Sequence, residues 1–325
     1  MNEGVAIAAA TAADLAVEFR SMASDVTLRI VDPGATAIVS VARAQSIVER
    51  VAATCTRFDP DSDLMRANAA GRGWQVVAPE CFEALQEAHR AHVTTGGLFD
   101  PRVLAVLTAY GYDASLPFEG RSVHLPTAST PEPRRPRRPW KPRFDAERSA
   151  VRVGREPIDL GGIGKGLAVR WAAQQLRGAG SAALVEAGGD LMAVGAGPEG
   201  SGWMVGVESP SGSGDPAAVL RVTDRACATS STRVRTWRAG ERTVHHLIDP
   251  RTGRSAESSL VSVTVVGADP ALSEVWSKSL FVVGKAGIRA AADEHGLAAL
   301  WIDADGHVGV SRAMRPYVAW QVSRV

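Results

Sequence analysis

Strand-like segments dominate the second half of the chain, mostly without the helix that a regular β–α–β alternation would place between them. They are rich in β-branched residues and are interrupted by glycine. They span residues 182–195, 202–209, 259–268, 298–303, 307–311 and 317–322. Successive parallel strands need long crossover connections, usually helices. The succession therefore predicts an α+β fold with mixed, largely antiparallel sheets flanked by helices.

Other segments show the apolar spacing of helices. Residues 37–55 and 79–93 repeat apolar side chains on one face, and Pro79 suits a helix start. Asp269 and Pro270 offer a cap and a first turn for a helix over 271–284. An earlier strand is predicted at 26–32.

The length of 325 residues allows one large domain or two ordinary ones, and we expect a single domain over residues 1–325. Hydrophobic residues make up 45% of the chain, which allows a sizeable core. The net charge of +1 argues against a nucleic-acid partner, which would require a basic excess. A Pro/Arg-rich segment at about 117–143 cannot form a helix, and we expect a surface loop there. It is either a docking arm for an acidic partner or an insertion of little consequence.

The cysteines and the N-terminal sequence indicate a cytoplasmic protein. Cys55, Cys81 and Cys227 lie far apart in the sequence without a CxxC pair, so we expect buried, reduced thiols. The first twenty residues carry Glu3 and Asp14 but no early basic residue, unlike a secretory signal. No apolar run reaches the length of a membrane span.

The stretch DLGGIGKG at 159–166 places four glycines and a lysine before a helical segment. A Walker loop requires Ser or Thr after its Gly-Lys pair, whereas Gly166 follows Lys165 here. A dinucleotide-binding G-x-G-x-x-G motif opens a βαβ unit, and here the third glycine comes one residue early, in mid-chain. The stretch is therefore either a tight turn or a phosphate-binding loop of another kind.

Five further segments are unusual in the same way. They read TRFDPDSDLMRAN (56–68), TGGLFDPRV (95–103), VEAGGDLMAVG (185–195), ATSS (228–231) and HHLIDPRTG (245–253). Together with DLGGIGKG they resemble the ApbE family of FAD:protein FMN transferases, from about Met22 to about Gly284. The resemblance implies that FMN is taken from FAD and joined by a phosphoester to a Ser or Thr hydroxyl of an acceptor protein. It also implies magnesium and the release of AMP.

The resemblance assigns flavin contacts position by position. Lys165 brings a positive charge for the diphosphate, and the glycines let backbone N–H groups approach it. The residues predicted to bind FAD are Met22, Phe58, Leu98, Phe99, Asp100, Asp159, Lys165 and Ile248.

Two neighbouring histidines are separated by strand geometry. Successive side chains of a strand alternate between faces, so His246 shares a face with Ile248 while His245 points the other way. By the resemblance, Ile248 contacts the flavin and His246 occupies the family's histidine position. We therefore predict His246 as the general base for the acceptor hydroxyl, with a structural histidine as the alternative. His245 is predicted to be structural or exposed.

The metal-binding helix departs from the family pattern. The resemblance implies magnesium held by the Gly162 carbonyl and by an Asp and a Thr, whose positions hold Glu274 and Lys278 here. Glutamate can bind magnesium and Ser277 offers an oxygen, whereas lysine only donates hydrogen bonds. The predicted metal residues are Gly162, Glu274 and Ser277. The pair Glu274 and Lys278 is either an exposed i,i+4 ion pair or a lysine standing where the metal would lie.

These departures leave three functions open. The leading one is a divergent flavin transferase. The alternatives are an FAD-binding protein of the same fold that has lost transfer, and an FAD pyrophosphatase that yields FMN and AMP. Arg102 and Arg170 replace a Thr and an Asp common in the family. They either add positive charge near the phosphates or reflect drift in a divergent member of the family.

Overall fold

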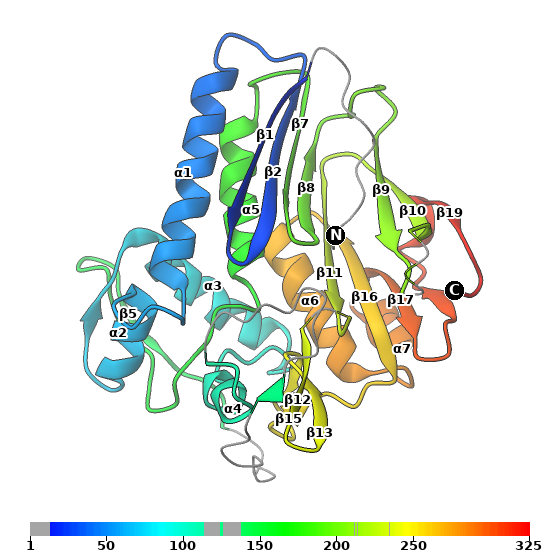
Figure 1. The fold of residues 1–325 in the computed structure, drawn as a ribbon. Coiled ribbons are helices and arrows are strands. Elements are labelled where there is room, and N and C mark those ends of the chain that lie inside the picture. The colour runs from blue at the N-terminus through cyan, green and yellow to red at the C-terminus, as the bar shows by residue number, and fades with distance from the viewer. Residues whose placement is uncertain (1–13, 114–123, 126–137, 211, 213, 234) are drawn as a thin grey trace. The chain divides into compact units, whose positions relative to one another are not determined.

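The computed structural model describes residues 14–113, 124–125, 138–210, 212, 214–233 and 235–325. Its helices are α1 (Ala37–Cys55), α2 (Asp63–Ala70), α3 (Pro79–Thr94), α4 (Leu104–Ala109), α5 (Gly164–Leu176), α6 (Pro270–Val283), α7 (Ile288–Glu294) and a short 3-10 helix (Arg315–Tyr317) (Figure 1). The Pro/Arg-rich segment 117–143 lies outside the described residues, apart from 124–125 and 138–143.

The strands of the described residues are mostly short. They are β1 (Leu15–Ser21), β2 (Ser24–Val31), β3 (Gln75–Val76), β4 (His124–Leu125), β5 (Arg143–Asp145), β6 (Ala150–Arg152), β7 (Ala182–Ala187), β8 (Asp190–Val194), β9 (Trp203–Glu208), β10 (Pro216–Val222), β11 (Arg225–Ser231), β12 (Thr236–Ala239), β13 (Arg242–His245), β14 (Ile248–Asp249), β15 (Arg254–Ser255), β16 (Leu260–Gly267), β17 (Ala298–Asp303), β18 (Val308–Val310) and β19 (Val318–Gln321). Among them, only β4 and β12 pair in parallel, and the other ladders are antiparallel. The predicted α+β class is confirmed.

The chain divides into two compact units, each made of segments that are distant in sequence. Unit 1 comprises the described residues of Met1–Glu49, Lys165–Ser231 and Ser258–Val325. Unit 2 comprises those of Arg50–Gly164 and Thr232–Glu257. The expectation of a single domain over 1–325 stays a prediction.

Unit 1 is built on an eight-stranded sheet in the order β1-β2-β7-β8-β11-β16-β17-β18. Helix α6 packs on β11 and β16, and a smaller sheet has the order β19-β10-β9 (Figure 1). A buried apolar cluster joins residues of both sheets, including Leu184, Leu191, Val205, Leu220 and Leu300. This cluster holds the smaller sheet against the eight-stranded sheet.

The first hairpin was only half predicted. The strand expected at 26–32 is β2, but its antiparallel partner β1 was not predicted. Met22 and Ala23 form the two-residue turn between them with φ of 52° and 55°. Two-residue hairpin turns of this hand favour Asn-Gly or Gly-Gly, because both central residues need positive φ. Met-Ala carries no such signal, so the hairpin was missed.

Unit 2 holds α2, α3 and α4 with short strand pairs. One apolar cluster gathers Tyr110, Tyr112, Trp237 and Ile248 with neighbouring aliphatic residues. Trp237 donates its indole N–H to the Tyr110 carbonyl at 2.8 Å. Trp140, at the described end of the Pro/Arg-rich segment, is buried and donates to the Val153 carbonyl at 2.8 Å. This end of the predicted surface loop is therefore anchored in the core of unit 2.

The cysteines behave as predicted from their spacing. Cys55, Cys81 and Cys227 are buried free thiols. A hydrogen bond with Cys55 and burial raise the pKa of the Cys81 thiol. Separately, none of the helices in the described ranges has both the length and the apolar character needed to cross a membrane.

One glycine of the DLGGIGKG stretch, Gly166, is required by the close packing of two helices. A Cβ atom added there would lie 2.6 Å from the Ala271 Cα atom and 2.7 Å from the Pro270 carbonyl oxygen, both at the start of α6. Helices α5 and α6 can approach this closely only because Gly166 has no side chain. Backbone atoms cannot move aside as a flexible side chain can.

We expect Gly166→Ala to lower the free energy of unfolding by about 1–3 kcal/mol, because overpacking forces the two helices apart. Urea denaturation measures this. Gly164→Ala is the matched control, since a Cβ there meets nothing within 4 Å. Equal stability of the two variants would contradict the close α5–α6 contact.

Candidate functional site

The predicted site residues fall into both units. Unit 1 holds Met22, Lys165, Glu274, Ser277 and Lys278. Unit 2 holds Phe58, Leu98, Phe99, Asp100, Asp159, Gly162, His246 and Ile248. Each group is described within its own unit.

In unit 1 the turn that carries Met22 lies against the Gly188–Gly189 turn. A Cβ added to Gly188 would lie 2.3 Å from the Ser24 hydroxyl oxygen, so the β7–β8 turn touches the β1–β2 turn. The Gly188 carbonyl also accepts a hydrogen bond from the Lys165 ammonium at 3.3 Å. The structure thus brings the Met22 turn and Lys165 to the same two-glycine turn.

Lys165 forms a buried ion pair that the sequence analysis missed. Its ammonium donates to Oδ2 of Asp190, whose side chain is 1% exposed. Oδ1 of Asp190 has no hydrogen-bond partner among the described residues. Burial raises the pKa of Asp190 to about 6, although the Lys165 ammonium opposes the rise. The available signal was a Gly-Gly-Asp turn leading into a strongly apolar strand, which places the carboxylate inside.

Glu274 and Lys278 form the predicted i,i+4 ion pair, but it is not an exposed one. The Lys278 ammonium lies 2.9 Å from Oε1 of Glu274, with side-chain exposures of 19% and 0%. Oε2 of Glu274 accepts the Gly166 N–H at 2.8 Å and so caps the first turn of α5. Burial by itself would raise the pKa of Glu274, yet Lys278, Lys165 and the Gly166 N–H hold this pKa below its ordinary value. Glu274 is therefore an ionised carboxylate within unit 1.

Ser277 is likewise bonded from within the chain. Its hydroxyl exchanges a hydrogen bond with the Ser230 hydroxyl at 2.7 Å and donates to the Glu274 carbonyl at 2.9 Å. Both Glu274 oxygens are occupied as well, and Lys278 has no lone pair to give. These residues do not fit a divalent cation, since every oxygen they offer already has a donor or an ammonium beside it.

In unit 2 an arginine that the sequence analysis passed over organises two predicted flavin contacts. The Arg57 guanidinium lies 4.3 Å from the Phe58 ring centroid and 4.2 Å from that of Tyr112. It also lies 3.8 Å from Oδ2 of Asp159. Asp159 Oδ1 accepts the Gly161 N–H at 2.9 Å, which fixes the start of the glycine stretch. Phe58 remains 39% exposed.

The segment of Leu98, Phe99 and Asp100 is held rigidly. The buried Asp100 carboxylate receives three hydrogen bonds from Arg102, from the backbone N–H, Nε and Nη2, at 2.7–3.0 Å. Phe99 is buried, its carbonyl contacts His92 Nδ1 at 2.9 Å, and Leu98 is half-buried. The positive charge expected from Arg102 is thus paired with Asp100, at the position predicted to bind flavin.

Arg170, the other added positive charge, is also paired. Its guanidinium donates to Asp269, the N-cap residue of α6, at 2.7 Å. The positive charge expected from Arg170 is therefore balanced by the Asp269 carboxylate within unit 1.

The two histidines do not sit on one continuous strand. β13 ends at His245 and β14 begins at Ile248, with a bend at His246. Side chains therefore do not alternate regularly from His245 to Ile248, and His246 and Ile248 need not share a face. His245 contacts the Ala256 carbonyl through Nε2 at 3.1 Å, and burial lowers its pKa, which fits the predicted structural role. Ile248 is buried in the apolar cluster of unit 2.

His246 is half-buried and is bound to one carbonyl. Its backbone N–H donates to the Arg235 oxygen at 3.3 Å, and its ring Nδ1 lies 3.4 Å from the same atom. Nδ1 in contact with a carbonyl favours the tautomer that carries its proton there, which leaves Nε2 as the acceptor. The role of His246 as a base stays a prediction.

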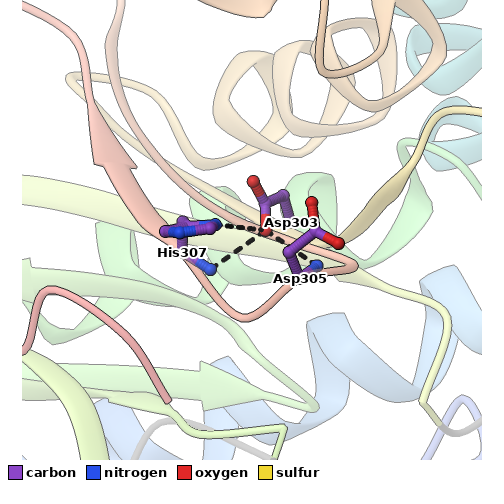
Figure 2. Close-up of side chains that lie close together, drawn as sticks. All are labelled: Asp303, Asp305 and His307. Carbon is purple, nitrogen blue, oxygen red and sulfur yellow. Dashed lines mark hydrogen bonds and ion pairs between the residues drawn. The ribbon is translucent and has the colours of Figure 1, made fainter.

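A separate group of side chains has the composition of a metal site. Asp303, Asp305 and His307 each bring one ligand atom to within 4.8 Å of the others at the β17–β18 turn (Figure 2). However, the Lys285 ammonium lies 2.8 Å from Asp303 and 2.5 Å from Asp305. Asp303 Oδ1 also accepts the N–H groups of Asp305 and His307. We assign this group to stabilising the turn.

Comparison with known proteins places these features in a family context. The sequence profile of the ApbE family matches residues 22–301. The FAD:protein FMN transferase of Haemophilus influenzae is 28% identical over 271 residues, which cover 78% of this chain and 75% of that protein. That of Escherichia coli K12 is 30% identical over 151 residues, covering 46% and 43%. The crystal structure of the ApbE protein of Thermotoga maritima superposes with a TM-score of 0.78 at 23% identity, covering 94% and 99%.

Proposed function

The chain belongs to the ApbE family, and on this premise we propose that it transfers FMN from FAD to a serine or threonine hydroxyl of an acceptor protein. The observation that carries this proposal is the family match over residues 22–301, which contains every residue predicted to contact flavin. The names of the relatives favour transfer over the two alternatives, a flavin carrier and an FAD pyrophosphatase.

The proposed reaction breaks one P–O bond of the FAD diphosphate and forms a P–O bond to the acceptor. The acceptor oxygen attacks the phosphorus of the FMN half of FAD, and the bond from this phosphorus to the bridging oxygen breaks. The bridging oxygen leaves with AMP, and the hydroxyl proton passes to a base, for which we propose Nε2 of His246. Lys165 stabilises the charge that grows on the departing phosphate, because a cation in a partly buried site acts strongly on such charge.

The flavin contacts keep their assignment as proposals, with roles adjusted to the geometry. Phe58 offers partly exposed aromatic surface, and Asp159 shapes the glycine stretch through the Gly161 N–H. We propose that Asp100 acts by holding Arg102 beside Leu98 and Phe99, since the guanidinium occupies its carboxylate. Met22 and Ile248 contribute apolar surface.

The setting of the reaction is also part of the proposal. Three buried free thiols suit a reducing compartment, so we propose a cytoplasmic protein. Its macromolecular partner is an acceptor protein and not a nucleic acid, in line with the net charge of +1.

The direct test is incubation with FAD and a Ser/Thr acceptor, followed by mass measurement of the acceptor and assay of AMP. If the chain transfers FMN, each acceptor gains one FMN group, bound through its phosphate, and one AMP is released. FMN and AMP in solution without modified acceptor would indicate a pyrophosphatase. Bound flavin with neither product would indicate a carrier.

His246→Ala is expected to slow transfer on the order of a hundredfold, the usual size of a general-base contribution, while FAD affinity changes little. His245→Ala is the neighbouring control and is expected to affect stability more than the transfer rate of the folded protein, since it removes the ring contact with the Ala256 carbonyl. Equal loss of transfer in both folded variants would remove His246 from the mechanism.

A further inference from the structure

Helix α6 carries a cation of its own where the family resemblance expects ligands for a divalent ion. The Lys278 ammonium lies 2.9 Å from Glu274 Oε1, and the Glu274 side chain has no exposed surface. Lys165 acts electrostatically on the same carboxylate. In the described part of unit 1, two ammonium groups and two carboxylates therefore form one buried cluster of Lys165, Asp190, Glu274 and Lys278.

A divalent ion at Glu274 would have to displace its existing partners. It would separate Glu274 from Lys278 and leave an ammonium, 19% exposed, beside a second cation. The neighbouring oxygen of Ser277 is bonded to Ser230 and to the Glu274 carbonyl. The other carboxylate of the cluster, Asp190, already balances the charge of Lys165.

An ammonium can nevertheless bind a diphosphate through its N–H donors. It has three N–H donors, and in the described residues Lys278 uses one of them, on Glu274. Lys165 directs its donors to Asp190 and the Gly188 carbonyl. The remaining donors of Lys278 are free for phosphate oxygens, and Glu274 holds its position through the helix and through Gly166.

We propose that the Lys278 ammonium, held by Glu274, takes the place of the divalent ion, so that this chain binds the FAD diphosphate without a metal. The inference rests on the proposed function for the identity of the ligand. The absence of a metal at α6 does not depend on the proposed function and can be measured on the protein alone.

The first measurement uses Mn²⁺ as a probe of the full chain and follows the electron paramagnetic resonance signal of the free ion. All proteins carry Asp305→Asn, which removes a carboxylate from the exposed Asp303 group. The otherwise unmodified protein is expected to bind no Mn²⁺ at α6. Lys278→Thr, which restores the family's residue next to Glu274, is expected to bind Mn²⁺ at least tenfold more tightly. Glu274→Gln/Lys278→Met removes both charges and serves as the metal-free control.

The second measurement is the Kd for FAD by flavin fluorescence, with magnesium and with EDTA. We expect less than a twofold change for the unmodified protein and at least a tenfold weakening by EDTA for Lys278→Thr. The inference is overturned if the unmodified protein binds Mn²⁺ that the control does not, if EDTA weakens its FAD binding tenfold, or if folded Lys278→Thr fails to gain Mn²⁺ binding. Should Lys278→Thr not fold, the unmodified protein and the control decide. A folded protein that binds no FAD under any condition refutes the proposed function, and the Mn²⁺ result then still decides the inference.

Discussion

Lys165→Met is expected to lower the free energy of unfolding by about 3–5 kcal/mol, because it leaves a buried carboxylate without its cation. Asp190 is almost fully enclosed, and its second oxygen has no hydrogen-bond partner among the described residues. Urea denaturation at pH 7 measures the loss.

The double variant Lys165→Met/Asp190→Asn separates charge from packing. It is expected to recover most of the loss, since an amide in the same place needs no counter-ion. pH gives a second check: a carboxyl whose pKa is raised on folding stabilises fully below its ordinary pKa, and this contribution is lost as pH rises through about 6. The deficit of Lys165→Met should therefore be smaller at pH 5 than at pH 8. A deficit that is the same at both pH values would show that Asp190 is not its source.

Arg102→Met is expected to lower the free energy of unfolding by a similar amount, about 3–5 kcal/mol, for the same physical reason in unit 2. The Asp100 side chain is 2% exposed and receives three hydrogen bonds from Arg102. Removing the guanidinium also removes the partner that holds the Asp100 side chain beside Leu98 and Phe99. Chemical denaturation and FAD titration together report both effects.

The matched control is a surface arginine in the same unit. Arg90 pairs with Glu87 on α3 while its side chain is 62% exposed, so Arg90→Met is expected to change stability by at most about 1 kcal/mol. If the two arginine variants lost the same stability, burial would not be what makes the Asp100 pair matter.

Periodicity was enough to predict the long elements. The helix expected at 271–284 is α6 at Pro270–Val283, because Asp269 caps it and Pro270 starts it, both local signals. β1 was missed because Met22 and Ala23 adopt positive φ without glycine, a conformation enforced by the pairing of the strands around them. Local sequence cannot report a conformation that tertiary contacts impose.

In the site, too, local sequence predicted some features while tertiary contacts determined the others. Spacing predicted that Glu274 and Lys278 would pair, but their burial depends on β11 and β16 beneath α6. Asp190 and Arg57 escaped notice because a Gly-Gly-Asp turn and an Arg-Phe pair are unremarkable until partners from distant segments meet them. The argument for His246 assumed one unbroken strand, and a bend of two residues removed it.

The interleaved path of the chain sets an order of completion during synthesis. Unit 2 has all its residues once Glu257 has been made, whereas unit 1 still awaits Ser258–Val325. Until β16 emerges, β11 is an open edge in the middle of the future eight-stranded sheet, ready to pair with a foreign strand. The nascent protein thus passes through a stage in which its smaller half is complete and its main sheet is an aggregation hazard. Truncation after Glu257 would make that stage permanent.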